Sequence, residues 1–229
     1  MTGPHVLVTR PAERAEPLAS RIASLGWTPL LAPALRTEPT GAALPDLSRF
    51  DGLVFTSAAG VRAFATLNPQ REQVAYAVGD ATADAARAIG FQNVVSAAGD
   101  VAALNALLGM GAVRSLLHVA GEDVAGEIAI GGQAIERVSL YRTVAEPSLP
   151  AAVRTALYAR TVNAACFLSP RSAVAFISLV DPDLLAPVRA LVLSGAIADA
   201  VATVRWQRVE VADRPTLDAL LERLGPYGA

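Results

Sequence analysis

Short apolar runs recur along the chain, and most of them end in a small or hydroxyl residue that is followed by a helical pattern. The strong runs span residues 5–9, 51–56, 74–79, 115–121, 164–169 and 189–195, and weaker ones span 28–31, 93–96, 134–140 and 206–211. Short buried strands that alternate with helices are typical of parallel sheets. The pattern therefore predicts an α/β protein.

The first predicted helix has recognisable ends. Glu16 and Pro17 can begin the helix LASRIASL, and Gly26 can end it. Because proline is excluded from a helix interior, residues 9–14 are predicted as a loop after the first strand. This loop places Arg10 near the carboxyl end of that strand.

An internal repeat is visible in the sequence. FTSAAGVRAF (55–64) aligns with FLSPRSAVAF (167–176) through both phenylalanines, the serine and an alanine. The next segment repeats too, since AYAVGDATADAARAIGF (75–91) matches ALVLSGAIADAVATVRW (190–206). The same order and a near-equal offset in both matches favour two related α/β domains.

Two segments break this rhythm, and their proline, threonine and charge predict linkers at residues 35–41 and 139–147. If these are the two crossings between domains, residues 1–36 and 144–229 form one domain, and residues 40–139 form a second domain inserted into it. The alternative is tandem order, which would leave the first strand without a partner in the N-terminal half. We therefore expect two similar lobes, each a small parallel sheet flanked by helices, joined by a two-segment linker.

Composition removes several classes of function. All 19 basic residues are arginine, which excludes Schiff-base chemistry, a P-loop lysine and pyridoxal attachment. A net charge of −2 with dispersed arginines gives no basic stripe, so we expect no nucleic-acid partner. The apolar runs are too short and too often interrupted by proline to span a bilayer, and the N-terminus lacks a signal-peptide pattern. We expect a cytoplasmic protein with no membrane contact.

The side chains that usually carry metal or covalent chemistry are few. Cys166 is the one cysteine and lies in the apolar run AACFL, which predicts a buried structural thiol and excludes an intrachain disulfide. His5 and His118 could not complete a four-ligand zinc site without carboxylates, so we expect no metal. The chain also has neither a Gly-x-Ser-x-Gly turn nor, after its first strand, a Gly-x-Gly-x-x-Gly loop, which argues against acyl-enzyme and dinucleotide chemistry.

Small and hydroxyl residues follow several of the predicted strands. In open parallel sheets ligands bind beyond the carboxyl ends of the strands, where helix N-termini present unpaired N–H groups. Capping of the next helix is an equally good explanation of a single hydroxyl, whereas two adjacent hydroxyls favour an anion site. The candidate binding residues are Arg10, Thr56, Ser57, Gly79, Thr82, Ser169, Arg171 and Ser194.

Several motifs together resemble one family, the uroporphyrinogen-III synthases. In chain order they are VLVTRPAE, FTSAAGV, AVGDATADAARAIGF, AAGDVAAL, SLYRT, ALVLSGAIADAV and RPTLDALLERL, and they cover nearly the whole chain. Two departures stand out. Ala59 replaces an asparagine that is common in the family, and GEDVAGE (121–127) replaces a frequent glycine-arginine helix start.

The resemblance implies a bilobal, cofactor-free enzyme that closes linear hydroxymethylbilane to uroporphyrinogen III, inverting the last ring and losing water. It implies that Tyr141 assists departure of the hydroxyl group, and that Thr56, Ser57 and Thr82 hold substrate carboxylates or the leaving group. It also implies a monomer, and it allows a transient contact with the upstream enzyme that forms the bilane. From the residues alone, an ordinary half-buried strand tyrosine is the alternative interpretation of Tyr141.

Two other functions stay open. Hinge-linked α/β lobes also serve non-catalytic binding or sensor proteins for small anions. A sugar-phosphate isomerase would need a glutamate or histidine near the hydroxyl turns, and the sequence indicates none there.

Overall fold

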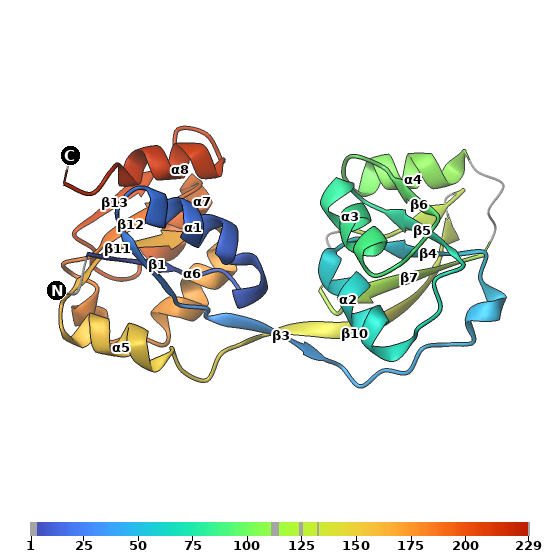
Figure 1. Ribbon diagram of the computed structural model, residues 1–229, viewed down its shortest axis with the longest axis horizontal. Helices are drawn as coiled ribbons and strands as arrows, with labels where there is room; N and C mark the ends of the chain where they lie inside the picture. The colour runs from blue at the N-terminus through green and yellow to red at the C-terminus, as the bar shows by residue number, and fades with distance from the viewer. Residues whose placement is uncertain (1–3, 111–114, 124–125, 132, 229) are drawn as a thin grey trace. The chain divides into compact units, whose positions relative to one another are not determined.

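The computed structural model describes residues 4–110, 115–123, 126–131 and 133–228 (Figure 1). The chain divides into two compact units. Unit 1 comprises residues 1–36 and 144–229, and unit 2 comprises residues 37–143. Unit 2 is thus inserted in the sequence between the two parts of unit 1.

Unit 1 is built on a sheet in the order β13-β12-β11-β1-β2, in which neighbouring strands pair in parallel. Its strands are β1 (His5–Val8), β2 (Thr28–Leu31), β11 (Val162–Phe167), β12 (Arg189–Val192) and β13 (Arg208–Val211). Its helices are α1 (Glu16–Ser24), α5 (Ala151–Tyr158), α6 (Pro170–Ile177), α7 (Gly195–Val201) and α8 (Leu217–Leu224), with 3-10 turns at Ala12–Arg14 and Pro182–Leu184.

Alternation along β1 divides the core of unit 1 between the two faces of the sheet. Leu7 packs with residues of α5, α6 and α7 on one face. Val6 and Val8 pack with residues of α1 and α8 on the other. Since both faces are covered, the strand is buried throughout, which explains why its sequence is continuously apolar.

Unit 2 has a sheet in the order β3-β10-β7-β4-β5-β6. Its strands are β3 (Leu35–Pro39), β4 (Gly52–Phe55), β5 (Val74–Ala77), β6 (Val94–Ser96), β7 (Leu116–Gly121) and β10 (Glu136–Ala145), with a separate pair β8 (Ala129–Ile130) and β9 (Gln133–Ala134). Its helices are α2 (Ala58–Leu67), α3 (Asp80–Ala88) and α4 (Val101–Gly109), with a 3-10 turn at Leu47–Arg49. Phe55 faces α2 and α3, whereas Val54 faces α4.

The predicted α/β class, with parallel sheets flanked by helices, is confirmed. The two copies of the sequence repeat pack alike. Phe55 meets Phe64 edge to face with ring centroids 5.8 Å apart, and Phe167 meets Phe176 in the same way at 5.5 Å. Each first ring also contacts the aromatic residue at the end of its repeat, which is Phe91 in unit 2 and Trp206 in unit 1.

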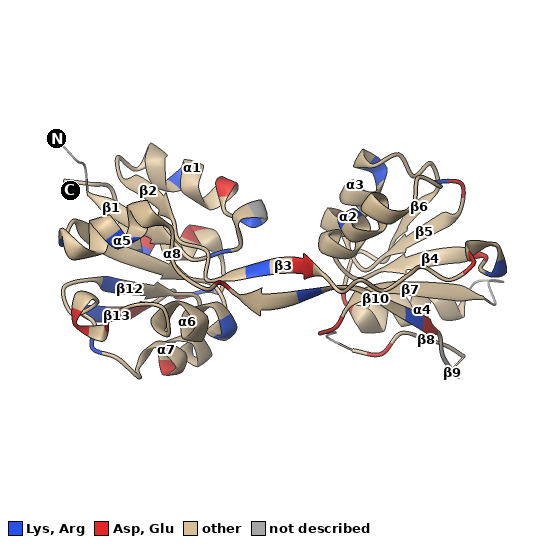
Figure 2. Ribbon diagram, turned by 90° about the horizontal axis from the view of Figure 1, so that it is seen from below, with Lys and Arg blue, Asp and Glu red and all other residues tan. Residues whose placement is uncertain are grey.

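The segments predicted as linkers, 35–41 and 139–147, contain the divisions between the two units at 36/37 and 143/144, and they form β3 and much of β10. The two strands run in opposite directions, as the Glu146 N–H donates to Ala34 O at 2.9 Å and the Thr40 N–H donates to Leu140 O at 3.1 Å. Figure 2 shows charged positions on both strands, and Arg142 pairs with Glu38 at 2.8 Å. Charge that pairs across a ribbon does not prevent strand formation.

Among the described residues, no helix combines the length and the hydrophobicity needed to cross a bilayer. The loop predicted at residues 9–14 contains a single 3-10 turn over Ala12–Arg14 before α1 begins at Glu16. Gly26 follows α1 with a φ of +84°, a conformation that favours glycine and ends the helix where the sequence predicted.

We propose that each unit is a separately folding domain, so a fragment of residues 37–143 should unfold cooperatively by itself. Val61 is 0% exposed in α2, and Val61→Ala should lower the free energy of unfolding of the fragment by about 2 kcal/mol. Leu67→Ala is the control, because Leu67 is 54% exposed on the same helix and its truncation should change little. Urea denaturation followed by circular dichroism measures both. A fragment without a cooperative transition contradicts the proposal.

Candidate active site

Polar residues of unit 2 gather where β7 and β4 end and where β10 passes beside them. These strands are neighbours in the sheet and pair in parallel, so β4 and β7 end at one edge, and β10 passes that edge at Tyr141 and continues to Ala145. Thr56 and Ser57 follow β4, Gly121 ends β7, and Tyr141 lies in β10. The structure therefore brings three of the predicted site residues to the same edge.

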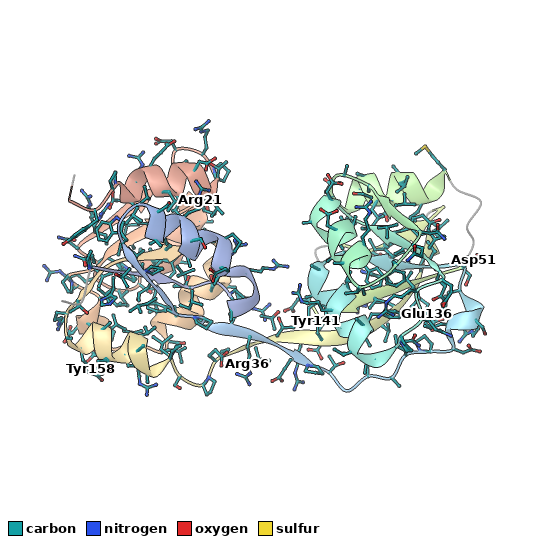
Figure 3. All side chains as sticks on the ribbon, viewed as in Figure 1. Arg21, Arg36, Asp51, Glu136, Tyr141 and Tyr158 are labelled. Atoms are coloured by element: carbon teal, nitrogen blue, oxygen red, sulfur yellow. The ribbon has the colours of Figure 1, made fainter. Side chains whose placement is uncertain are left out.

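Ser57 makes two contacts with its hydroxyl group. As the N-cap of α2 it accepts a hydrogen bond from the Gly60 N–H at 3.0 Å, which is the capping role that the sequence left open beside anion binding. Its Oγ also lies 2.7 Å from the hydroxyl oxygen of Tyr141, which is labelled in Figure 3. Ser57 thus links the start of a helix to the phenol.

Tyr141 owes its position to an irregularity in β10. Ser139 pairs with Ala120 and Tyr141 pairs with Gly121, so β10 carries one residue more than β7 between these pairs. The extra residue, Leu140, is 2% exposed and joins the hydrophobic core. Bulges of this kind redirect the following side chain, and here the half-buried Tyr141 follows.

Thr56 contacts a histidine that was not among the predicted site residues. Its Oγ1 lies 3.1 Å from Nε2 of His118, which is only 3% exposed in β7. Burial, and then the charge of Arg137, lower the pKa of His118 to about 4. The imidazole is therefore neutral at neutral pH, and it engages the Thr56 hydroxyl from inside the sheet.

Gly79 and Thr82 begin the neighbouring helix α3. Gly79 is its N-cap residue and provides no side chain for capping. Thr82 is 7% exposed, so its side chain offers little surface to a ligand. Asp80 in the same turn accepts a hydrogen bond from the Ser96 hydroxyl at 2.8 Å. The backbone amides of this turn are the groups best suited to bind an anion.

Unit 1 has a second set of candidates at the carboxyl ends of β1, β11 and β12, which are neighbouring parallel strands. Ser169 caps α6 by accepting from the Ser172 N–H at 3.2 Å, and Arg171 lies in the first turn of that helix. Ser194 is the N-cap residue of α7 but makes no capping bond with its side chain. These three residues follow β11 and β12.

Arg10 follows β1 at the same edge and is half-buried. Within the described part of the chain its guanidinium makes no hydrogen bond or ion pair. Burial, and then the nearby Arg14, lower the pKa of Arg10 from its ordinary value. A desolvated arginine of this kind gains most from a carboxylate ligand.

A thiol and a metal site were also considered from the sequence. Cys166 is 0% exposed, and burial raises its pKa to about 12, which confirms the predicted structural thiol. Over the residues that the structure describes, no three His, Cys, Asp or Glu side chains gather closely enough to hold a metal ion.

Comparison with models of known families identifies the family of this chain. A family model described as uroporphyrinogen-III synthase HemD matches residues 16–222. The chain belongs to the uroporphyrinogen-III synthase family. The resemblance seen in the sequence motifs is thereby confirmed. Comparison with curated proteins found no matching sequence.

Solved structures of uroporphyrinogen-III synthases also resemble the chain. The synthetase from Helicobacter pylori 26695 has a TM-score of 0.61 at 16% identity, with 96% of this chain and 98% of that chain covered. This likeness supports the shared fold. Wild-type and mutant synthases from the extremely thermophilic bacterium Thermus thermophilus give TM-scores of 0.44 and 0.48, both at 22% identity, with 96% of this chain and 96% and 97% of those chains covered.

In this member of the uroporphyrinogen-III synthase family, two residues at the site were not predicted from the sequence. His118 was considered only as a metal ligand, although a lone polar residue in a strand of apolar neighbours was a signal that it has a polar partner. Gly121, which lies against the ring of Tyr141, was taken only as the end of a strand. In the segment GEDVAGE, Val124 and Ala125 lie outside the described residues.

His118 should make the protein sensitive to acid. Its pKa is about 4 in the folded chain and near 6.5 when unperturbed, so the unfolded state binds more protons between these values. Stability therefore falls as the pH is lowered, by about 2 kcal/mol from about pH 7 to about pH 5. His118→Gln places an amide near the position of Nε2, so it can still bond Thr56, but it does not titrate. Urea denaturation at both pH values should show a correspondingly smaller loss for the variant, whereas equal losses contradict the assignment.

Proposed function

We propose that this chain closes hydroxymethylbilane to uroporphyrinogen III, with inversion of the terminal ring and loss of water, and so serves tetrapyrrole biosynthesis. Membership of the uroporphyrinogen-III synthase family over residues 16–222 carries this conclusion. The polar edge of unit 2 supplies side chains that fit the reaction.

The chemistry asks for few protein groups. The pyrrole expels its hydroxyl group to give an azafulvene, the C–O bond breaks, and the oxygen leaves as water once it has received a proton. Inversion of the last ring needs two C–C bonds to form and one to break: the azafulvene carbon bonds to the substituted α carbon of that ring, the bond from this carbon to the neighbouring bridge breaks, and the bridge re-bonds to the free α carbon. Loss of the proton from that last carbon restores the pyrrole and the donor. The protein needs to hold the substrate in one geometry and to place a weak acid beside the leaving oxygen.

Tyr141 is the residue that we propose as that acid. Phenols carry their proton at neutral pH. The Tyr141 hydroxyl is already fixed by Ser57 at 2.7 Å, so it does not have to be ordered when substrate binds. Its position at the ends of parallel strands is where α/β sheets bind ligands.

The acetate and propionate groups of the substrate need cationic and N–H partners. In unit 2 we propose the first amides of α2 and α3 as binding groups, together with Thr56, Ser57, the backbone of Gly79 and the Thr82 hydroxyl. The Thr82 N–H itself donates to Gly79 O at 3.0 Å. In unit 1 we propose a second group of binding residues made of Arg10, Ser169, Arg171 and Ser194. Two features support this assignment: the guanidinium of Arg10 is partly desolvated, and the hydroxyl of Ser194 is not used to cap its helix.

The cellular setting rests on the family alone. We propose a cytoplasmic monomer that works without a cofactor and meets the upstream bilane-forming enzyme transiently. The family membership is what supports these points.

Incubation of the purified protein with hydroxymethylbilane should yield the type III isomer. Spontaneous closure in buffer gives mainly type I, so the isomer ratio reports catalysis directly. Chromatography of the oxidised porphyrins measures it. Type I product formed at the rate of the buffer control contradicts the proposal and favours a non-catalytic binding protein.

Tyr141→Phe should lower kcat by up to about a hundredfold, the low end of the usual range for general-acid assistance, because the azafulvene forms with little help. Thr82→Ala should cost less, since the backbone amides of α3 remain. Tyr158→Phe is the matched control, because Tyr158 is 70% exposed in α5 of unit 1. If Tyr141→Phe keeps full turnover while Thr82→Ala abolishes it in a folded protein, the tyrosine only packs and the hydroxyl turns carry the leaving group.

A further inference from the structure

The hydrogen bond between Tyr141 and Ser57 joins strands that are not neighbours. The sheet order places β7 between β10, which carries Tyr141, and β4, which precedes Ser57. To reach Ser57, the tyrosine ring has to cross the carboxyl end of β7. What stands at that end therefore decides whether the bond can form.

Gly121 stands at the crossing. A Cβ atom at this position would lie 2.7 Å from both Cε2 and Cζ of Tyr141 and 3.1 Å from its hydroxyl oxygen. Carbon atoms do not approach this closely without repulsion, so any side chain at 121 would displace the ring. The backbone of Gly121 pairs directly with Tyr141 across the two strands, which holds the two residues together.

A second glycine brings Ser57 close to β7. A Cβ atom on Gly60, in the first turn of α2, would lie 2.8 Å from the carbonyl oxygen of Val119 in β7. The start of α2 therefore rests directly on the strand that the tyrosine crosses. The Gly60 N–H donates to Ser57 Oγ at 3.0 Å, so the same residue also orients the serine.

We propose that Gly121 is a positioning residue of the reaction: its missing side chain lets the Tyr141 ring cross β7, so that Ser57 can hold the phenol where the leaving oxygen departs. This inference rests on the proposed function of the chain. Gly121 acts through Tyr141 and does not touch the reacting atoms.

The same geometry gives Ser57 a role other than binding a carboxylate. Its Oγ accepts from the Gly60 N–H, and in the proposed arrangement it donates its own proton to the Tyr141 oxygen, 2.7 Å away. The phenol proton then stays available for the leaving oxygen, and the O–H bond of Ser57 supports the phenolate that forms. The hydrogen bonds from Gly60 to Ser57 and from Ser57 to Tyr141 polarise one another, and this series begins at the N-terminus of α2, the positive end of the helix dipole.

Gly121→Ala tests the inference. The atoms that a Cβ at position 121 would meet belong to the Tyr141 side chain, which can rotate away. We therefore expect the variant to fold with the Tyr141 ring displaced. The expected result is a roughly ten- to hundredfold fall in kcat with little change in KM, because misplacement by about 1 Å has such effects. Gly109→Ala is the matched control, because a Cβ at Gly109 meets no atom within 4 Å.

A readout that does not depend on activity separates this inference from the proposed function. In protein labelled with 13C at tyrosine Cζ, the Tyr141 signal, assigned with Tyr141→Phe, should move in Gly121→Ala and stay in Gly109→Ala. If the wild type forms no type III isomer but the signal moves, the function fails and the placement stands. An unmoved signal, or full kcat in Gly121→Ala of an active enzyme, overturns the inference.

Ser57 variants keep the inference testable if Gly121→Ala does not fold. Ser57→Ala removes the partner of the phenol without adding an atom, and it should move the Tyr141 signal and lower kcat. Ser57→Thr keeps a hydroxyl group, so its Tyr141 signal and its kcat should both be close to those of the wild type. Equal behaviour of Ser57→Ala and the wild type contradicts the role of Ser57 and, with it, the placement of Tyr141.

Discussion

The polar edge of unit 2 depends on one hydrogen bond, the 2.7 Å contact between the Ser57 and Tyr141 hydroxyl groups. It can form only because β10, β7 and β4 are neighbouring parallel strands, β7 between the other two ends in Gly121, and an extra residue in β10 redirects the tyrosine. All three conditions are features of the strands and their pairing, and none of them is a property of the Ser57 and Tyr141 side chains themselves. The phenol is therefore held before any substrate arrives, which is how preorganised sites avoid the cost of reorganisation.

The two units share packing but differ at their strand ends. In both, a serine after a central strand caps the next helix, by accepting from Gly60 in unit 2 and from Ser172 in unit 1. In unit 2 the hydroxyl groups are engaged by Tyr141 and His118. In unit 1 a half-buried arginine and an N-cap serine keep hydrogen-bonding capacity for a ligand. Unit 2 thus offers an ordered acid beside two helix N-termini, and unit 1 offers further anion-binding groups.

Local patterns allowed much of the fold to be predicted, and the repeat showed that two similar sheets exist. Tyr141 was identified through the family resemblance, and its position could not be derived locally, because the bulge at Leu140 depends on how β10 pairs with β7. The pairing of β3 with β10 was missed for a similar reason, since the partners of Arg142 and Arg36 lie about a hundred residues away in sequence. His118 shows that one polar residue inside an apolar strand signals a buried contact.

A double-mutant cycle between Ser57→Ala and Tyr141→Phe tests the central claim most directly. If Ser57 works through the phenol, its substitution should lower kcat in the wild type and should have no further effect once the Tyr141 hydroxyl is gone. The double variant would then turn over as slowly as Tyr141→Phe alone. Losses that multiply, so that the double variant is slower than Tyr141→Phe by the full factor of Ser57→Ala, would show that the two hydroxyl groups act independently and would contradict the account.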